Sequence, residues 1–189
     1  ICINHGISIA PYVIIDKLTD IKEKIDGLQF PLIVKPVVGA GSRGVNKINT
    51  AKEIDSAVGD AFYHSKEGRI IVEEFIEGCE LSIETFYNNK NLKLLANSKR
   101  VVNKHMCAKE ISSFELDGTI KEKIYNQIDE IYNILNCPNG PGHFEAIIDK
   151  FGEPVLIDMA FRGGGFEIFN YLVKEVSGFD IVKNTILQF

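Results

Sequence analysis

The sequence contains the apolar run Phe30-Pro31-Leu32-Ile33-Val34-Lys35-Pro36, which holds one cation near its end and leads into the glycine-rich loop Gly39-Ala40-Gly41-Ser42-Arg43-Gly44-Val45. Glycines let backbone N–H groups approach phosphate oxygens closely, and they adopt positive φ without a steric cost. Lys35 and Arg43 supply the positive charge that a triphosphate requires. The stretch therefore predicts a strand and a loop that bind a polyphosphate.

The loop also fits, in part, two better known phosphate-binding motifs. Residues 39–44 match the spacing G-x-G-x-x-G, but a dinucleotide-binding loop opens directly into a helix. Here residues 45–48 have an extended pattern, and Thr50 with Glu53 predicts the helix start. A Walker A loop ends in Gly-Lys-Ser/Thr, which is absent. We therefore expect a flap between two strands, as in kinases. From these residues alone, an ordinary glycine-rich hairpin is the alternative.

Residues 142–160 predict two strands around a turn at Phe151-Gly152. A turn centred there places Glu145 opposite Asp158. Like charges about 5 Å apart destabilise a sheet, so a cation is expected between them. Mg²⁺ fits, because it needs only one or two protein carboxylates when phosphates supply other oxygens. Arg162 follows on the same face if the strand continues that far, within reach of an anionic group. A register slip of one residue would leave only a polar stripe.

Residues 69–84 form an apolar strand, a dense acidic turn and a second, alternating strand. Taken alone, these acids are typical of a protected sheet edge. However, three features recur in order: a lysine with a glycine flap, a strand that ends in Glu-Glu-aromatic-aliphatic, and a carboxylate hairpin with an arginine and glycines. In this combination the sequence resembles the ATP-grasp family, in the branch similar to the carbamoyl-phosphate synthetase large subunit and biotin carboxylase.

The resemblance implies an α+β fold, the ATP-grasp fold, in which two α/β lobes hold ATP between them. It places residues 7–75 in a small lid subdomain that carries the glycine flap, and residues 76–189 in a larger subdomain that carries the metal site. Similar segments in the family follow an amino-terminal domain, and this sequence begins at Ile1 without an initiator Met. We therefore expect an excised fragment that is inactive alone.

The family motifs fall on particular residues of this chain. Lys35 takes the place of the phosphate-binding lysine, and the resemblance implies that it is a catalytic residue together with Arg162, which would contact the transferred phosphate or the substrate. Glu145 and Asp158 become ligands of Mg²⁺, with Mn²⁺ as the alternative ion. Glu80 takes the ribose hydroxyls. The resemblance implies the following nucleotide-binding set: Lys35, Gly39, Ala40, Gly41, Ser42, Arg43, Gly44, Glu73, Glu74, Phe75, Ile76 and Glu80.

Two departures from the family pattern lie in the metal site. Asp158 is one methylene shorter than the usual Glu, and Ala160 stands where many members have an Asn ligand. We expect weaker or altered metal binding from these changes.

The implied function is that of an ATP-dependent carboxylate–amine ligase, or a related ligase, acting through an acyl phosphate. Its partners would be ATP, a small carboxylate substrate and a nucleophilic acceptor, and the full-length protein would form a homodimer. Two alternatives remain open. One is a phosphoryl-transfer enzyme of the same fold, and the other is a non-catalytic ATP-binding module.

Composition agrees with these expectations. An apolar content of 45% is enough for a core, and the net charge of −5 argues against nucleic-acid binding. No apolar run approaches membrane-spanning length, and the scattered cysteines are typical of reduced thiols in the cytoplasm. The sequence also predicts helices at 50–64, 118–136, 166–176 and 180–188, a turn at 88–91, and strands on both sides of 103–105. Lys99, Arg100 and Lys104 are further candidates for phosphate contacts, and His143 is expected opposite Ala160 as a packed histidine.

Overall fold

The computed structural model describes residues 2–19, 21–102, 108–113, 115–165 and 167–188. Among these residues the chain divides into two compact units. The first unit contains residues 10–76, and most of residues 77–189 belong to the second.

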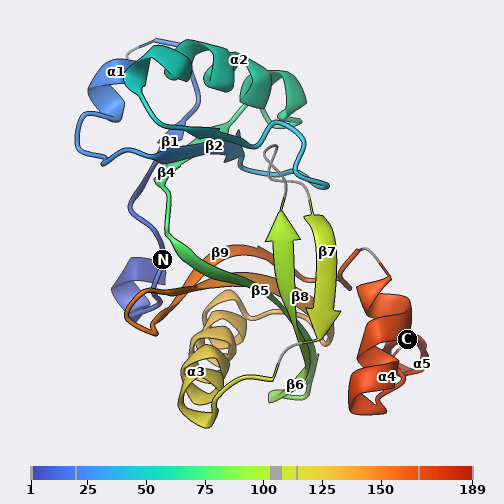
Figure 1. Cartoon of the computed structure of the whole chain (residues 1–189). Helices are drawn as coiled ribbons and strands as arrows, with labels where there is room; N and C mark the ends of the chain where they lie inside the picture. The colour runs from blue at the N-terminus through green and yellow to red at the C-terminus, as the bar shows by residue number, and fades with distance from the viewer. Residues whose placement is uncertain (1, 20, 103–107, 114, 166, 189) are drawn as a thin grey trace. The chain divides into compact units, whose positions relative to one another are not determined.

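The first unit is built on a sheet with the strand order β1-β4-β2-β3, named sheet I here (Figure 1). Strand β2 pairs antiparallel with both β3 and β4. The elements of this unit are β1 (Tyr12–Ile15), α1 (Ile21–Lys24), β2 (Leu32–Pro36), β3 (Asn46–Ile48), the 3₁₀ turn η2 (Ala51–Glu53), α2 (Ile54–His64) and β4 (Ile70–Glu74).

Alternation along the strands divides sheet I into an apolar face and a polar face. Leu32 and Val34 of β2 belong to a buried core that includes residues of α1 and α2, and both helices lie on this side of the sheet (Figure 1). Ile33 and Lys35 point to the other face, because successive side chains in a strand alternate. The cross-strand partners of Ile33 are Lys47 on β3 and Glu73 on β4, so these charged residues share the helix-free face.

The helix expected after the glycine loop is confirmed. The Glu53 carboxylate accepts hydrogen bonds from the Thr50 N–H at 3.0 Å and from the Thr50 hydroxyl at 2.9 Å. The predicted start signal therefore forms, with one 3₁₀ turn before α2 begins at Ile54.

The second unit is built on a longer sheet with the strand order β7-β6-β5-β8-β9, named sheet II here. Its elements are the 3₁₀ turn η1 (Cys2–His5), β5 (Gly78–Asn88), β6 (Asn91–Val102), β7 (Ala108–Ser113), α3 (Gly118–Leu135), β8 (Gly140–Asp149), β9 (Pro154–Ala160), the π-helical turn η3 (Ile168–Leu172), α4 (Val173–Ser177) and α5 (Ile181–Ile186).

Helix α3 covers the apolar face of sheet II (Figure 1). Its buried residues Ile124, Ile128 and Tyr132 pack in one cluster with Leu81 of β5 and Phe144 of β8. The helix over 118–136 is thus confirmed. Ile131 is buried as well, whereas Leu135 at the end of the helix is exposed.

The β5–β6 connection is the tight turn that the sequence predicts. Asn88 pairs with Asn91, and Asn89 and Lys90 between them both have positive φ, as a two-residue hairpin loop requires. Strands β6 and β7 lie on either side of residues 103–105, as expected, and those three residues, Lys104 included, are outside the described part of the chain.

The C-terminal segment packs on the other face of sheet II. Ile168, Val173 and Ile181 form a small core with Phe86 of β5 and Ala96 of β6. The two closing helices are therefore present, although the first begins with a π-helical turn at Ile168. Within the described ranges, no helix combines the length and the apolar character needed to cross a membrane.

Candidate functional site

The glycine loop connects β2 to β3 and is a flap between two strands, as predicted. Gly41, Ser42 and Gly44 have φ values of 67°, 55° and 73°. Arg43 is exposed, and its Nε donates a 3.4 Å hydrogen bond to the Ala40 carbonyl within the loop. Gly39 and Ala40 are exposed as well. The loop thus presents a curved backbone and a cationic side chain, the features that a phosphate-binding flap requires.

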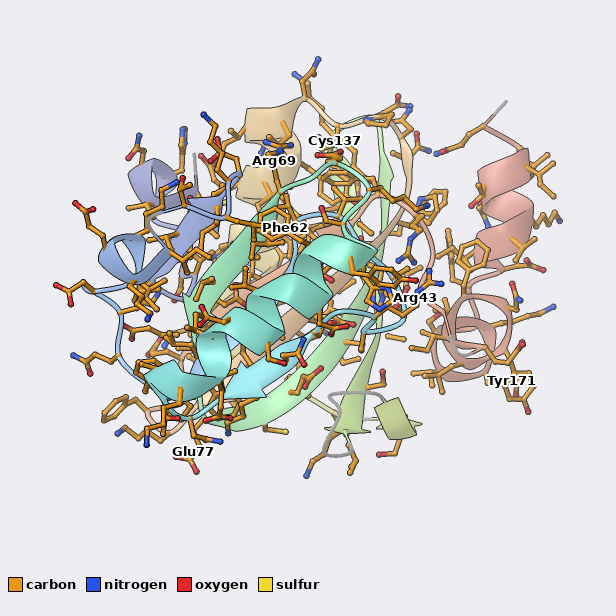
Figure 2. All side chains as sticks on the ribbon, turned by 90° about the horizontal axis from the view of Figure 1, so that it is seen from above. Arg43, Phe62, Arg69, Glu77, Cys137 and Tyr171 are labelled. Atoms are coloured by element: carbon orange, nitrogen blue, oxygen red, sulfur yellow. The ribbon has the colours of Figure 1, made fainter. Side chains whose placement is uncertain are left out.

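Gly44 has a structural requirement that the other loop glycines lack. A Cβ there would lie 2.9 Å from the His64 Cβ and 3.3 Å from the Ala61 Cα, both on α2. A Cβ at Gly41 would meet no atom within 4 Å. The loop is therefore anchored against the last turn of α2 at Gly44, next to Arg43, which Figure 2 labels.

Lys35 forms an ion pair with Glu73 across β2 and β4. The Lys35 Nζ lies 2.6 Å from the Glu73 Oε1, and the two side chains are 20% and 11% exposed. The resemblance implies a backbone role for the segment around Glu73, and sequence reasoning missed the role of its side chain. The pair arises because Glu73 is opposite Ile33, two residues from Lys35 on the same face. Only the strand register reveals that proximity.

The segment after β4 is held by backbone and side-chain contacts. The Phe75 N–H donates to the Pro31 carbonyl at 2.9 Å, and Glu74 accepts a 2.9 Å hydrogen bond from the Gln29 N–H. The Lys47 Nζ lies 3.3 Å from the centroid of the Phe75 ring, well within cation–π range. Lys47 was not among the expected residues. Its place opposite Ile33 puts it on the same face as Lys35 and Glu73.

The expected pairing of Glu145 with Asp158 is confirmed, and it depends on a β-bulge in the hairpin. Near the turn, Ala146 pairs with Leu156, which places the turn centre on Phe151, half a residue earlier than expected. A regular ladder would therefore bring Ile157 opposite Glu145. The register shifts between Glu145 and Ala146, and this bulge restores Asp158 to the position opposite Glu145.

The two carboxylates are suitable ligands for a hard divalent cation that takes only one or two of its ligands from the protein. The Glu145 side chain is 17% exposed, and Asp158 is exposed at the same end of the hairpin. No group of three or more His, Cys, Asp or Glu side chains suited to a metal was found among the described residues. Mg²⁺ commonly binds through one or two carboxylates while phosphates and waters complete its shell. Ala160 lies opposite His143 and adds no ligand.

His143 lies between two carboxylates and is mostly buried. Its Nδ1 contacts Glu84, and its Nε2 lies 3.4 Å from the Glu145 Oε1. Burial alone lowers the pKa of His143, but the hydrogen bonds with Glu145 and Glu84 and their negative charges outweigh burial and raise the pKa to about 9. His143 is therefore packed, as expected, and it also pairs with two carboxylates. Sequence reasoning missed Glu84, which is opposite His143 on β5.

Arg162 does not lie on the strand, so the expectation that it shares a strand face with Asp158 is wrong. Strand β9 ends at Ala160, and Arg162 follows in a bend, exposed, with its Nη1 donating to the Gly163 carbonyl at 2.8 Å. The glycines after it are tightly packed. A Cβ at Gly163 would lie 1.9 Å from the Phe169 ring, and the Gly164 N–H donates to the Glu84 Oε2 at 3.2 Å.

Three further expected residues lie on sheet II. Glu80 is opposite Ile147, two residues from Glu145 on the same face. Lys99 is opposite Leu81, whose side chain is in the α3 core, so Lys99 lies on the other face from Glu145 and the expected phosphate contact is not supported. Arg100 is in β6, and its side chain is not described.

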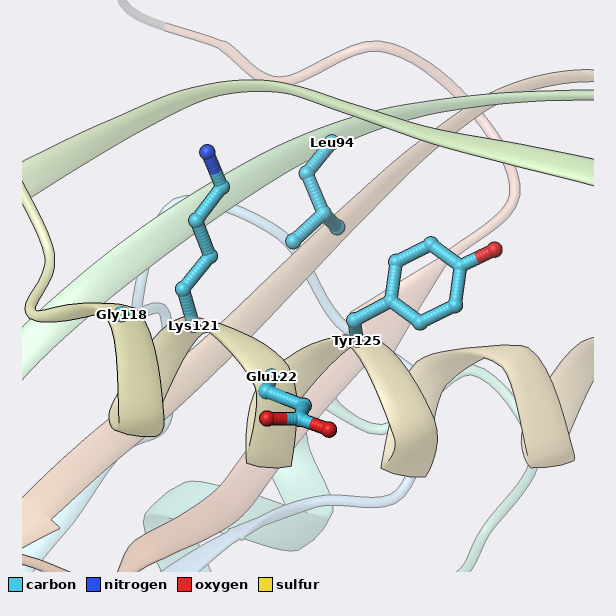
Figure 3. Close-up of a pocket in the computed structure, with 5 residues that line it drawn as sticks. All are labelled: Leu94, Gly118, Lys121, Glu122 and Tyr125. Carbon is cyan, nitrogen blue, oxygen red and sulfur yellow. The ribbon is translucent and has the colours of Figure 1, made fainter.

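A separate hollow of about 330 Å³ lies between β6 and the start of α3. Lys121 and Tyr125 rise from α3 on the side of Leu94, and Glu122 points away from them (Figure 3). Its lining includes none of the expected site residues.

Known proteins resemble this chain in sequence and in fold. The family model of the ATP-grasp domain matches residues 28–169. The D-alanine--D-alanine ligase of Clostridium beijerinckii is 27% identical over 162 residues, which are 82% of this chain and 52% of that ligase. The crystal structure of L-amino acid ligase from Bacillus licheniformis has a TM-score of 0.80 at 26% identity, covering 98% of this chain and 44% of that one.

A more distant structure has the same fold. Biotin carboxylase from Campylobacter jejuni, solved as a β-γ-ATP complex, has a TM-score of 0.81 at 19% identity and covers 97% of this chain and 42% of that one. The chain spans about half the length of the curated relatives it matches.

Proposed function

The chain belongs to the ATP-grasp family, and on this premise we propose that it is the ATP-binding part of a ligase that activates a carboxylate as an acyl phosphate for attack by an amine or a related nucleophile. The observation that carries the proposal is the cross-strand pair of Glu145 and Asp158 within the matched segment. Two facing carboxylates repel each other, and a Mg²⁺–nucleotide complex would add a divalent cation to the imidazole that already contacts Glu145.

In the first unit, Lys35, Arg43 and the backbone N–H groups of the flap would bind the phosphates. Lys35 lies near the end of β2, where it is ion-paired with Glu73, and Arg43 lies in the exposed loop that follows. Phosphoryl transfer depends mainly on positioning and on neutralising the charge that develops on the transferred group. The segment at Phe75 and Ile76 would supply the adenine pocket, with Lys47 over the Phe75 ring.

In the second unit, Glu145 and Asp158 would hold the Mg²⁺. The ion would neutralise charge on the phosphate oxygens when it is bound. Asp158 is one methylene shorter than a Glu would be, and Ala160 adds no ligand, so the phosphates themselves would complete much of the coordination.

The reaction needs no general base in its first step, because the substrate carboxylate is already ionised at neutral pH. A carboxylate oxygen attacks the γ-phosphorus, the bond to the bridging oxygen breaks, and ADP leaves with that electron pair. The nucleophile then attacks the acyl carbon, the bond from that carbon to the phosphate oxygen breaks, and phosphate leaves with the electron pair, while an amine nucleophile gives up its proton to solvent. Arg162 would contact the transferred phosphoryl group or the substrate.

Calorimetric titration with ATP, with and without Mg²⁺, tests this proposal. Wild-type binding should strengthen with Mg²⁺, and Lys35→Ala and Glu145→Gln should each weaken it. Lys22→Ala and Glu130→Gln are matched controls, since they remove an exposed lysine on α1 and a partly exposed carboxylate on α3. Binding that ignores Mg²⁺ and both variants in a folded chain would contradict the assignment.

A non-catalytic ATP-binding module is the alternative, favoured by Asp158 and Ala160 in the metal site. Metal-dependent ATP turnover by a longer form of the protein would rule it out. Analysis of the products with candidate acceptors would then separate a ligase from an enzyme that stops at a phosphorylated product.

A further inference from the structure

Glu84 is a carboxylate that the family motifs leave without a role. It lies on β5, on the face of sheet II that also carries Glu145, and it is 0% exposed. Burying a carboxylate is unfavourable unless its oxygens are paired or hydrogen-bonded. Its surroundings must therefore satisfy both oxygens.

The two oxygens of Glu84 contact two different parts of the unit. Its Oε1 contacts the Nδ1 of His143 on β8, and its Oε2 accepts the 3.2 Å hydrogen bond from the Gly164 N–H in the segment after β9. A Cβ at Gly164 would lie 2.5 Å from the Glu84 Oε1 and 2.8 Å from the His143 Nδ1. The backbone at Gly164 is thus held directly against the Glu84–His143 pair.

The contacts continue from His143 to the predicted metal ligand. The His143 Nε2 lies 3.4 Å from the Glu145 Oε1, so one imidazole bridges the buried carboxylate and the one that faces Asp158. In the other direction, Gly164 is two residues from Arg162. A continuous chain of contacts therefore runs from the segment that bears Arg162, through Glu84 and His143, to Glu145.

We propose that Glu84 and His143 are positioning residues of the nucleotide–metal site: Glu84 orients the imidazole that holds the Glu145 carboxylate, and it fixes the backbone beside Arg162. This inference rests on the proposed function, because it gives Glu145 and Arg162 the roles assigned there. Both residues act through their neighbours and contact neither metal nor substrate in this role.

The energetics favour positioning over a purely structural role. Replacing a buried ion pair by apolar residues of similar volume is often neutral or stabilising, so stability alone is a weak reason for such a pair. The loop after β9 has other anchors, since Gly163 packs on Phe169 and the small core around Ile168 covers the nearby end of the sheet. By contrast, mutation of a residue that hydrogen-bonds to a metal ligand typically changes the metal affinity about 10–100-fold.

The test measures Mn²⁺ binding in the presence of ADP, from the electron paramagnetic resonance signal of free Mn²⁺. Glu84→Gln and His143→Gln should each weaken Mn²⁺ binding about 10–100-fold. The double variant should be no weaker than the single ones, because the two residues act as one unit. The matched control is the pair His5 and Glu130, which are 3.1 Å apart in the same unit, and Glu130 is on α3, across sheet II from Glu145. His5→Gln and Glu130→Gln should bind as wild type does.

A second readout uses the metal-free chain. The amide resonance of Gly164 should shift in the ¹H–¹⁵N spectrum of Glu84→Gln and exchange faster with solvent in Glu84→Ala, and its position in Glu130→Gln should not change. If Glu84→Gln fails to fold, His143→Gln and its effect on the same resonance decide the question.

The outcomes separate the inference from the function beneath it. If Glu145→Gln loses Mn²⁺ while Glu84→Gln and His143→Gln bind as wild type does, the positioning role is wrong and the proposed function stands. If wild type and Glu145→Gln bind Mn²⁺ equally, the proposed function fails, and the positioning role fails with it.

Discussion

The ion pair of Lys35 and Glu73 shows that one residue can serve both the fold and the site. Lys35→Ala removes a cation 2.6 Å from a mostly buried carboxylate, so we expect the first unit to lose about 1–3 kcal/mol of stability. Urea denaturation of Lys35→Ala beside Lys22→Ala measures the loss. Equal midpoints for the two variants would contradict the expectation, and any loss found must be considered when nucleotide binding by Lys35→Ala is interpreted.

The raised pKa of His143 predicts how the stability of the chain depends on pH. Its pKa is raised to about 9 by Glu145 and Glu84 in spite of burial, from 6.5 in an exposed histidine. In the metal-free chain, a nuclear magnetic resonance titration of the imidazole should therefore have its midpoint near 9. Because the folded pKa is the higher one, the stabilisation is fully present below pH 6.5 and is lost as the pH rises through about 9.

Denaturation at several pH values checks that sign. The difference in stability between wild type and His143→Gln should shrink between pH 6.5 and 9. A difference that grows with pH would mean that the imidazole is held neutral.

At the scale of elements, the β2–β3 flap has an exposed loop around Gly41 and is packed against α2 at Gly44. Gly41→Ala has open space and should cost only the left-handed backbone conformation, about 1–2 kcal/mol. Gly44→Ala should cost about 1–3 kcal/mol more, because its Cβ would press on His64 and Ala61 of α2. Thermal denaturation of the two variants gives the comparison, and a Gly44→Ala chain as stable as Gly41→Ala would show that the loop is not anchored there.

In the β8–β9 hairpin, the turn centre differs by half a residue from the position that the sequence predicts. Asp149 accepts hydrogen bonds from the N–H groups of Phe151 and Glu153, at 2.8 and 2.9 Å, and so centres the turn on Phe151. We expect Asp149→Ala to destabilise the hairpin by about 1–2 kcal/mol, the net worth of two hydrogen bonds. Chemical denaturation measures this, with Asp129→Ala as the control, which removes a partly exposed carboxylate on α3.

Across the whole molecule, the two units have separate hydrophobic cores. Ile54 belongs to the core under sheet I and Ile128 to the core under sheet II, and both are 0% exposed. Truncating either to alanine should cost about 2–5 kcal/mol. Hydrogen exchange read by mass spectrometry should show that Ile54→Ala speeds exchange in residues 10–76 more than in α3, and that Ile128→Ala does the reverse. Equal acceleration throughout either variant would mean that the units unfold together.

Local pattern was enough to predict much of the architecture. The strand, flap, strand order at Lys35, the capped helix after Thr50 and the turn at Asn89-Lys90 depend on residues close in sequence. Propensity, capping and turn chemistry act over such short distances, so each of these features follows from the amino-acid sequence alone. The pairing of Glu145 with Asp158 was also predicted, although a bulge at Ile157 was needed to produce it.

The contacts that give the site its chemistry required the folded chain. Glu73 beside Lys35, Lys47 over Phe75, and Glu84 between His143 and Gly164 join residues from strands or loops far apart along the sequence. Their proximity depends on strand order and register, and a shift of one residue would turn each side chain to the opposite face. Sequence motifs identified the residues at the centre of the site, whereas sheet pairing selected the neighbours that hold them.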